Sequence, residues 1–387
     1  MKNVVVRAPL LTKSGYGVHA RQLFQYLLTK PNINIVTQCV PWGVTPWYTN
    51  WEDCGGLVGE VIRRSAKDQD QKFDVSFQVI LPNEWDTSAA HYNVGVTAGV
   101  ETDKANPLWP AVHCNKMDKV IVPSQHTKKS LESGASSSTP IHVVPESYFS
   151  ELISDPVDLG LELTSDFNFL TVGVLTGHTP ETDRKNLFYL IKWFVEEFKK
   201  DTNVGLIIKT NRGRETAIDR NNTKALLENI LKQIGHSGNP KIYLLHGNMT
   251  RKEMNSLYRD KNVKALISAT RGEGFGLPLL EASVAGLPVM ATNWSAHTEF
   301  LNEGRWLKFE YDLTKVDSTR IDGNIFMEGA QWASPKEDSV KKTMRKFYKS
   351  SEIPTRWAND LSQKLQEKYS ISEIFREYDK VLSEVLD

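Results

Sequence analysis

Two glutamates flank a glycine-rich turn in the segment ISATRGEGFGLPLLEASVAGLPVMAT, residues 267–292. Glu273 precedes the turn and Glu281 follows it, with Gly274 and Gly276 between them. Glycine lets the backbone approach a ligand closely, and a carboxylate accepts hydrogen bonds from the hydroxyl groups of a sugar or a ribose. The residue types point to a site for a polyhydroxyl ligand. The other interpretation is a plain tight turn in which Glu281 complements a helix dipole.

The predicted elements around this turn place it at an edge where ligands bind. Residues 263–268 predict a strand before the turn, and Pro278 stands at a favoured early position of a helix that ends at Gly286. Ligands of open parallel sheets bind beyond the carboxyl ends of the strands. Free N–H groups at the helix start favour an anion, and helical side chains lean toward the N-terminus, so Glu281 can face the same ligand as Glu273. Carboxylates that accept hydrogen bonds from hydroxyl groups, placed beside a site for an anion, are what a sugar nucleotide requires.

The composition is that of a two-domain globular protein. The chain has 387 residues, of which 40% are hydrophobic and 24% charged. Basic and acidic residues each total 47, so the net charge indicates neither a nucleic-acid nor a membrane partner. Cys39, Cys54 and Cys114 include no Cys-x-x-Cys pair, which argues against a disulfide framework or a structural zinc site. No apolar run approaches the roughly 20 residues of a transmembrane helix, and we expect a cytoplasmic protein.

Short apolar runs alternate with longer amphipathic ones, a pattern typical of parallel sheets covered by helices. In the first half the expected strands are residues 3–7, 34–37, 74–78, 93–97, 119–122 and 141–144, with a helix over 18–28. In the second half they are residues 169–174, 204–210, 241–245, 263–268 and 288–291, with helices over 187–200, 225–235 and 250–259. Residues 145–168 break both periods and mark the join between the two halves.

These patterns predict an α/β protein with two parallel sheets in separate domains. We expect an N-terminal domain over residues 1–155 and a C-terminal domain over residues 165–350. Residues 351–387 are helical by period, with one helix expected over 355–386, and would pack across both domains.

The run EGFGLPLLE, residues 273–281, resembles the two-glutamate signature of retaining glycosyltransferases of family 4, which have the GT-B fold. The similarity continues in the segments KVIVPSQHTKKSLESG, IHVVPES, VGVLTGHTPETDRKNLFYLIKWF and GLPVMAT. The resemblance implies two Rossmann-like domains that face each other across a cleft, with the C-terminal helix crossing back to the N-terminal domain. The N-terminal domain would bind the acceptor, and the C-terminal domain would bind the nucleotide-sugar donor.

The resemblance also implies roles for the signature residues. Glu281 would hold the ribose hydroxyls of the donor, and Glu273 would contact the transferred sugar. The backbone near the sugar and the phosphate would come from Gly274, Phe275, Gly276 and Leu277.

Two basic residues match the pair that neutralises the leaving diphosphate in this family, Arg184 and Lys185. Elementary electrostatics agrees, because breaking a glycosyl–phosphate bond builds charge that fixed cations stabilise. The other interpretation is a pair of exposed charges at a helix N-terminus, where cations are unfavourable. The chain departs from the family at Val174, where many members have arginine, and Lys209 is a candidate substitute for that charge.

The N-terminal half offers further candidates. Gly15 and Gly17 precede a helix, and in the family a similar loop lies against the donor phosphates. Residues Glu101, Thr102 and Asp103 follow a predicted strand and are expected at the cleft edge as acceptor or sugar contacts.

Aromatic residues crowd the segment PWGVTPWYTNW, residues 41–51. Trp47 and its neighbours either stack on an acceptor sugar or pack in the core.

Asp68 and Asp70 form an acid-x-acid motif that elsewhere binds a divalent metal. Here they lie in the polar run RRSAKDQDQK, so a solvated surface is the stronger interpretation and no metal site is predicted.

We therefore predict a retaining, metal-independent, hexosyltransferase-like enzyme that uses a nucleotide-diphosphate sugar, with UDP-sugar favoured over GDP-sugar. The acceptor would be a hydroxyl group of a glycan, a lipid or a small molecule. Three alternatives stay open: a glycosyltransferase acting on hydroxymethylated bases in DNA, a sugar-nucleotide epimerase and a non-catalytic sugar-nucleotide-binding protein. A DNA acceptor would require a basic face, which the net charge does not indicate. Donor base, donor sugar, acceptor and oligomeric state are left open by the sequence.

Overall fold

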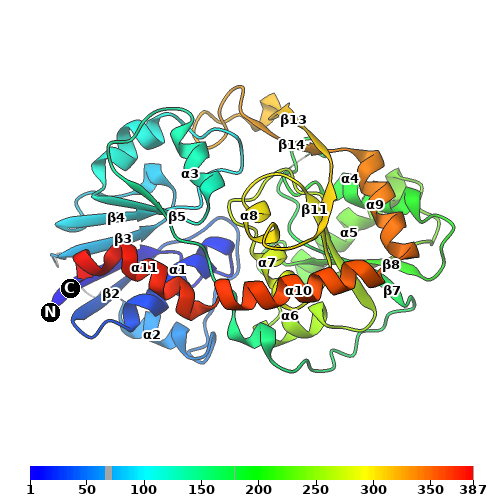
Figure 1. The fold of residues 1–387 in the computed structure, drawn as a ribbon, viewed down its shortest axis with the longest axis horizontal. Helices are drawn as coiled ribbons and strands as arrows, with labels where there is room; N and C mark the ends of the chain where they lie inside the picture. The colour runs from blue at the N-terminus through cyan, green and yellow to red at the C-terminus, as the bar shows by residue number, and fades with distance from the viewer. Residues whose placement is uncertain (66–71, 178, 387) are drawn as a thin grey trace. The chain divides into compact units, whose positions relative to one another are not determined.

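The computed structural model describes residues 1–65, 72–177 and 179–386 and divides the chain into two compact units (Figure 1). The first unit comprises Met1–Ser147, Asp322–Met327 and Ile371–Asp387, and the second comprises Tyr148–Ile321 and Glu328–Ser370. The change of unit after Ser147 falls within the segment 145–168 that breaks the sequence periods.

The first unit is built on a six-stranded parallel sheet with the order β2-β1-β3-β4-β5-β6. Its strands are β1 (Lys2–Ala8), β2 (Ile33–Cys39), β3 (Val75–Val79), β4 (Tyr92–Val96), β5 (Lys119–Val122) and β6 (Ile141–Val143). The three consecutive valines Val4, Val5 and Val6 of β1 are all fully buried, as expected for a parallel strand that is covered on both faces. The six strands predicted for this half are confirmed.

Four α-helices accompany this sheet among the described residues: α1 (Gly15–Leu28), α2 (Leu57–Arg63), α3 (Gln125–Glu132) and α11 (Ile371–Leu386). Short helical turns cover Pro82–Glu84 (η1), Trp109–His113 (η2) and Cys114–Lys116 (η3). Helix α11 returns the chain to the first unit, where the Tyr26 hydroxyl donates to Asp379 at 2.9 Å and Lys119 Nζ donates to Val381 O at 2.6 Å. The expected return of the C-terminal helix to the N-terminal domain is confirmed.

The second unit also has a six-stranded parallel sheet, with the order β12-β11-β10-β7-β8-β9. Its strands are β7 (Phe167–Val172), β8 (Val204–Thr210), β9 (Lys241–His246), β10 (Val263–Ser268), β11 (Val289–Thr292) and β12 (Leu307–Phe309). The five strands predicted for this half are confirmed, but β12 and the antiparallel hairpin of β13 (Tyr311–Lys315) and β14 (Gln331–Pro335) were not predicted. Strand β13 is largely exposed and therefore lacks the apolar alternation that marks a strand in sequence.

The helices of the second unit are α4 (Leu187–Glu197), α5 (Ala217–Gln233), α6 (Arg251–Tyr258), α7 (Leu277–Val284), α8 (His297–Leu301), α9 (Glu337–Lys349) and α10 (Glu352–Lys368), with turns η4 (Ser150–Ile153) and η5 (Ser318–Arg320). The helix predicted over 225–235 is confirmed as α5, but it begins earlier, at Ala217, because the Thr216–Asp219 capping box starts it there. The single C-terminal helix expected over 355–386 is instead two helices, α10 in the second unit and α11 in the first.

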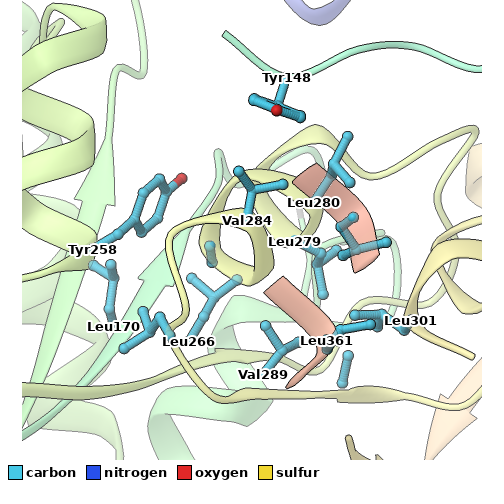
Figure 2. Packing of buried hydrophobic residues seen from close by; sticks show 14 of the residues in the cluster. Tyr148, Leu170, Tyr258, Leu266, Leu279, Leu280, Val284, Val289, Leu301 and Leu361 are labelled. Carbon is cyan, nitrogen blue, oxygen red and sulfur yellow. The ribbon is translucent and has the colours of Figure 1, made fainter. Parts of the chain in front are cut away.

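Helix α7 is embedded in the core of the second unit (Figure 2). Leu279, Leu280 and Val284 of this helix belong to one cluster with Leu170 and Leu266 of the sheet. The same cluster contains Tyr148, Tyr258, Val289, Leu301 and Leu361. Helix α7 is therefore packed on several sides, and this packing fixes the C-terminal end of the loop that precedes it.

The turn before α7 requires glycine at position 276. Gly276 has a φ angle of 100°, in the left-handed region, and a Cβ added there would lie 2.9 Å from His297 Cβ. Neither the conformation nor the space accommodates a larger residue.

Among the described residues, no helix has both the length and the apolar character needed to cross a membrane. The three cysteines, Cys39, Cys54 and Cys114, are all free thiols in the described part of the chain.

Two glycines of α1, one closely packed and one open, test how tightly this helix packs in the first unit. A Cβ at Gly17 would lie 2.2 Å from Thr12 O, whereas a Cβ at Gly15 would meet nothing within 4 Å. We expect Gly17→Ala to lower the free energy of unfolding by about 1–3 kcal/mol, the range for overpacking. Gly15→Ala should leave it unchanged or raise it by up to about 1 kcal/mol, because alanine favours the helix. Urea denaturation followed by tryptophan fluorescence measures both, and equal midpoints for the two variants would contradict the packing described.

Candidate active site

Glu273 is a buried carboxylate held between two cations. Glu273 is 5% exposed and lies in the loop after β10. Lys185 Nζ lies 2.7 Å from Oε1 and 2.9 Å from Oε2, and Arg184 Nη1 lies 3.2 Å from Oε2. The structure thus brings together three residues that the sequence singled out on segments far apart in the chain. We call Arg184, Lys185 and Glu273 the charge cluster.

The electrostatics of the charge cluster favour binding of an anion. Burial raises the pKa of the Glu273 carboxyl, but the charges of Lys185 and Arg184 outweigh burial and bring this pKa down to about 2. Glu273 is therefore ionised at neutral pH, and the cluster holds two positive charges against one negative charge. A phosphate group that approached it would meet a net positive charge in a partly desolvated site, where electrostatic interactions are strong.

Asp183 fixes the loop that carries both cations. It is fully buried, and its Oδ1 accepts from the N–H of Thr176 at 2.9 Å and from that of Lys185 at 3.2 Å. Its Oδ2 accepts from Leu187 N at 2.8 Å, which satisfies a donor at the start of α4. Asp183 was not predicted from the sequence. The available signal was an acidic residue directly before the basic pair and four residues before the first helical position.

A second network holds the main chain of Glu273. Glu273 N donates to Ser295 Oγ at 2.9 Å, and Ser295 Oγ lies 3.3 Å from His297 Nδ1. Because Thr292 O only accepts, His297 Nε2 at 2.7 Å must carry the hydrogen, and Nδ1 accepts from the serine hydroxyl. His297 is fully buried, and burial lowers its pKa, which keeps the ring neutral. No sequence motif predicted this relay, because its members meet only in the folded loop.

Glu281 has a different environment from Glu273. It lies on α7, is partly exposed, and accepts a hydrogen bond from the Tyr258 hydroxyl at 3.0 Å. Burial raises the pKa of Glu281 to about 7, although the Tyr258 hydrogen bond and the charge of Arg251 oppose this shift. Two carboxylates with opposite pKa shifts are suited to different tasks.

The turn between the two glutamates is buried at Gly274, Phe275 and Gly276. Phe275 is only 5% exposed, and its ring packs 5.5 Å from that of Phe300. Gly276 is the N-cap of α7. Pro278 has no N–H group and Leu279 N donates to Gly276 O at 2.9 Å, so of the first three helical residues only Leu277 has an N–H without an intrahelical partner. At this turn the Phe275 ring packs in the core and is not available for binding.

Lys209 is separate from the charge cluster in its contacts. It is the penultimate residue of β8 and is 5% exposed, and its Nζ donates to Gly247 O. Burial lowers its pKa to about 8. In this structure Lys209 holds the loop after β9.

The candidates of the first unit lie on two loops. Gly15 is exposed at the start of α1, whereas Gly17 is buried against Thr12 and has a packing role. Trp47 is 42% exposed and forms a β-bridge with Thr12, which places it beside the loop that leads to Gly15. Trp51 is 49% exposed, so this part of the aromatic segment lies at the surface of its unit rather than in the core.

The loop after β4 carries the other candidates. Thr102 is fully buried and its hydroxyl donates to Lys104 O at 2.9 Å, so it shapes the loop rather than reaching a ligand. Glu101 and Asp103 are partly exposed. Tyr16 lies between these two loops, since its hydroxyl is 2.9 Å from Thr97 Oγ1 and its ring stacks on Trp42 at 3.9 Å.

Asp68 and Asp70 lie outside the described residues. In the part of the chain that the structure describes, no group of three or more histidine, cysteine, aspartate or glutamate side chains is placed to hold a metal ion.

The segment that carries this site is similar in sequence to known proteins. Residues 181–314, which contain the charge cluster and Glu281, match the family model described as "Glycosyl transferases group 1". A sucrose synthase from Melioribacter roseus is 25% identical over 180 residues, covering 42% of this chain and 21% of the sucrose synthase. The chain thus spans about a fifth of that relative's length.

Solved structures match over the whole chain. Sucrose-phosphate synthase from Thermosynechococcus elongatus has a TM-score of 0.68 at 11% identity and covers 100% of this chain and 99% of its own. HepE from Anabaena, solved with UDP and glucose, has a TM-score of 0.64 at 12% identity and covers 100% of both chains. The chain has the GT-B fold. Its two parallel sheets are those of the two Rossmann-like domains predicted from the sequence.

The role of Asp183 as the organiser of the cation loop can be tested by Asp183→Asn. The amide has one acceptor oxygen in place of two, so a buried N–H group at Leu187 or Thr176 loses its partner. We expect the free energy of unfolding to fall by about 1–3 kcal/mol. Asp166→Asn, at an exposed aspartate that also accepts a side-chain hydrogen bond, is the control and should change it by less than about 0.5 kcal/mol. Equal stability of both variants in urea denaturation would remove Asp183 from this role.

Proposed function

We propose that this chain is a retaining, metal-independent glycosyltransferase. It transfers a hexose or a similar sugar from a nucleotide-diphosphate sugar to a hydroxyl acceptor, with a UDP-sugar favoured over a GDP-sugar. The observation that carries the proposal is the charge cluster. In it Lys185 and Arg184 pair with Glu273 in loops that follow the carboxyl ends of two parallel strands. The resemblance to family 4 supports retention, and the UDP and glucose in the HepE structure support the choice of donor.

The charge cluster suits the departure of a nucleoside diphosphate. When the bond between the anomeric carbon and the phosphate oxygen breaks, negative charge grows on the phosphate. Cations that are already fixed stabilise this charge without reorganising. Lys185 and Arg184 meet this requirement because Asp183 and Glu273 hold them in the ligand-free protein.

Binding of the diphosphate would change the partners within the charge cluster. Lys185 and Arg184 would turn part of their hydrogen bonding from Glu273 to the phosphate oxygens, which are strong acceptors. Glu273 would then have a free oxygen to accept from a hydroxyl of the transferred sugar. The same two cations supply the charge that a divalent metal supplies elsewhere, and we therefore propose a reaction without metal.

Glu281 is the proposed partner of the donor ribose. Its position on α7 and its partial exposure allow it to accept from ribose hydroxyls, while Tyr258 orients the carboxylate. The acceptor substrate is proposed to bind the first unit. There the exposed Trp47 offers a flat face for a sugar ring, and the carboxylates of Glu101 and Asp103 can accept hydrogen bonds from hydroxyl groups. Free cysteines fit a cytoplasmic enzyme.

Donor turnover with the acceptor omitted tests the chemistry. A panel of nucleotide sugars led by UDP-glucose should show slow hydrolysis that persists in EDTA, and NMR should detect the α-anomer of the released sugar first when the donor is α-linked. Glu273→Gln should lower this rate by roughly 10²-fold, the scale of one lost transition-state contact. It should bind UDP at least as tightly as the native protein, because its cations are no longer neutralised. Loss of the reaction in EDTA with recovery in Mn²⁺, or initial release of the β-anomer, would contradict the proposal.

The raised pKa of Glu281 predicts that donor affinity depends on pH. UDP-glucose carries no group that titrates near neutrality, so its binding reports on the protein. Because the ionised carboxylate is the better acceptor and its pKa is about 7, affinity should rise by up to roughly tenfold between pH 6 and pH 8. Glu281→Gln should bind with an affinity that is the same at both pH values. Calorimetric titration measures this, and a similar pH dependence in both proteins would rule out Glu281 as the source.

The same pKa shift has a consequence for stability. A carboxyl whose pKa is raised in the folded state stabilises the protein fully below its ordinary pKa, and this contribution is lost as pH rises through about 7. The donor-free protein therefore carries an unfavourable, partly buried charge at pH 8, which Glu281→Gln removes.

A further inference from the structure

A cavity of about 390 Å³ lies in the second unit, apart from the residues assigned to the donor. It is lined by residues of α4, of the loops before α4 and before Glu273, and of β13, β14 and the loop after β13. Asn186, Trp193, Arg271, Asp317 and Trp332 are among the residues that line it. We call it the Trp193 cavity. Its volume is within the range of about 300–1,000 Å³ that is usual for small-molecule sites.

Two buried donors in the wall of the Trp193 cavity lack partners. Asn186 is 1% exposed and Trp193 is 6% exposed. Among the residues that the structure describes, Asn186 Nδ2 and Trp193 Nε1 have no hydrogen-bond acceptor. The orientation of the Asn186 amide is fixed by chemistry, because Arg271 Nη2 lies 3.3 Å from Oδ1 and a guanidinium can only donate. Buried polar groups are almost always paired in folded proteins, so these two donors indicate a missing acceptor.

Arg271 adds further donors to the same wall. Its guanidinium makes three long hydrogen bonds, to Asp183 O at 3.3 Å, Asn186 Oδ1 at 3.3 Å and Ser334 Oγ at 3.5 Å. It also lies 5.6 Å from the centre of the Trp332 ring. Since a guanidinium carries five N–H donors, Arg271 retains donor capacity toward a ligand.

The rest of the lining is aromatic and acidic. The rings of Tyr189 and Trp193 are stacked with centroids 5.6 Å apart, and both residues line the cavity. Glu181 and Asp317 supply acceptor oxygens, and the Tyr189 hydroxyl donates to Glu181 at 2.7 Å. The wall thus combines flat rings, buried donors and carboxylate acceptors.

The balance of charge selects a neutral ligand. Arg271 and Lys315 are the cations of the lining, and Glu181 and Asp317 are its anions. A phosphate or a carboxylate would be attracted by the first pair and repelled by the second. A sugar ring matches all features, because its hydroxyl groups both donate and accept while its C–H face packs on an aromatic ring.

We propose that the Trp193 cavity is a second saccharide-binding site that takes one neutral sugar unit, separate from the nucleotide-sugar site. Trp193 Nε1, Asn186 Nδ2 and the Arg271 guanidinium donate to its ring and hydroxyl oxygens. Glu181 and Asp317 accept from its hydroxyl groups at the rim.

The occupied cavity would act on the charge cluster through two residues. Asn186 directly follows Lys185 and caps α4 in the left-handed conformation, with a φ angle of 55°. Arg271 N donates to Arg184 O at 2.8 Å, while its side chain lines the cavity. A sugar that orders Asn186 and Arg271 therefore orders the loops that carry both cations. The site positions the cations without contacting the donor.

Binding can be measured without any knowledge of the reaction. Saturation-transfer NMR on the full chain, with UDP present in excess, would screen glucose, galactose, N-acetylglucosamine, maltose and sucrose at millimolar concentration. We expect at least one of these sugars to bind. Trp193→Phe keeps the aromatic wall but removes the N–H donor, and Glu181→Gln removes a rim charge; each should weaken binding at least about fivefold. Trp357→Phe, which changes a tryptophan outside this cavity, should leave binding unchanged.

Several results would overturn the proposal. Binding of no sugar in the presence of UDP would do so, as would sugar binding that both Trp193→Phe and Glu181→Gln leave intact. Inorganic phosphate or uridine, tested as separate probes, should not bind in a Trp193-dependent way; if either did, the cavity would not be a saccharide site. Because the readout is binding, it stands even if no nucleotide sugar is turned over.

Discussion

The pairing of the buried Glu273 carboxylate with Lys185 and Arg184 is the constraint on which the rest of the site depends. An ionised group that is 5% exposed is several kcal/mol less favourable than in water unless opposite charges surround it. The partners come from a loop 88 residues earlier in the sequence, at the end of β7. The β7–α4 and β10–α7 loops therefore have to meet, and the parallel order β10-β7 in the sheet makes this possible.

Each of the supporting residues fixes one segment of main chain that this ion pairing requires. Asp183 fixes the main chain under the two cations, and the Ser295–His297 relay fixes the main chain of Glu273. Gly276 allows the turn to enter α7, whose apolar face is packed in the core shown in Figure 2. The site is thus organised before any ligand binds, which is the condition for fixed charges to stabilise a transition state. In the proposed reaction this ion pair would exchange partners, since a diphosphate offers the cations more acceptor oxygens than one carboxylate does.

Local signals in the sequence were sufficient for most of the fold, whereas Arg184 and Lys185 were singled out by the family resemblance. The run EGFGLPLLE combines a glycine turn, an early proline and a helical period, and the Thr250–Glu253 capping box starts α6 as predicted. The features that were missed depend on tertiary contacts. Asp183 appears as an ordinary loop acid until the folded chain gives it four hydrogen bonds, and Ser295 and His297 gain meaning only beside Glu273. Strand β13 is exposed, and only its pairing with β14 reveals it.

The central claim is that Lys185 exchanges Glu273 for the β-phosphate of the donor, and a cycle of two ligands and two proteins tests it most directly. Calorimetric titration of UDP and UMP into the native protein and into Lys185→Ala separates the contribution of the β-phosphate from that of the rest of the nucleotide. The account predicts that Lys185→Ala weakens UDP binding by roughly tenfold or more, the scale of a lost charge-assisted hydrogen bond, while UMP binding changes by less than about threefold. Equal weakening of both ligands, or no change in either, would contradict it.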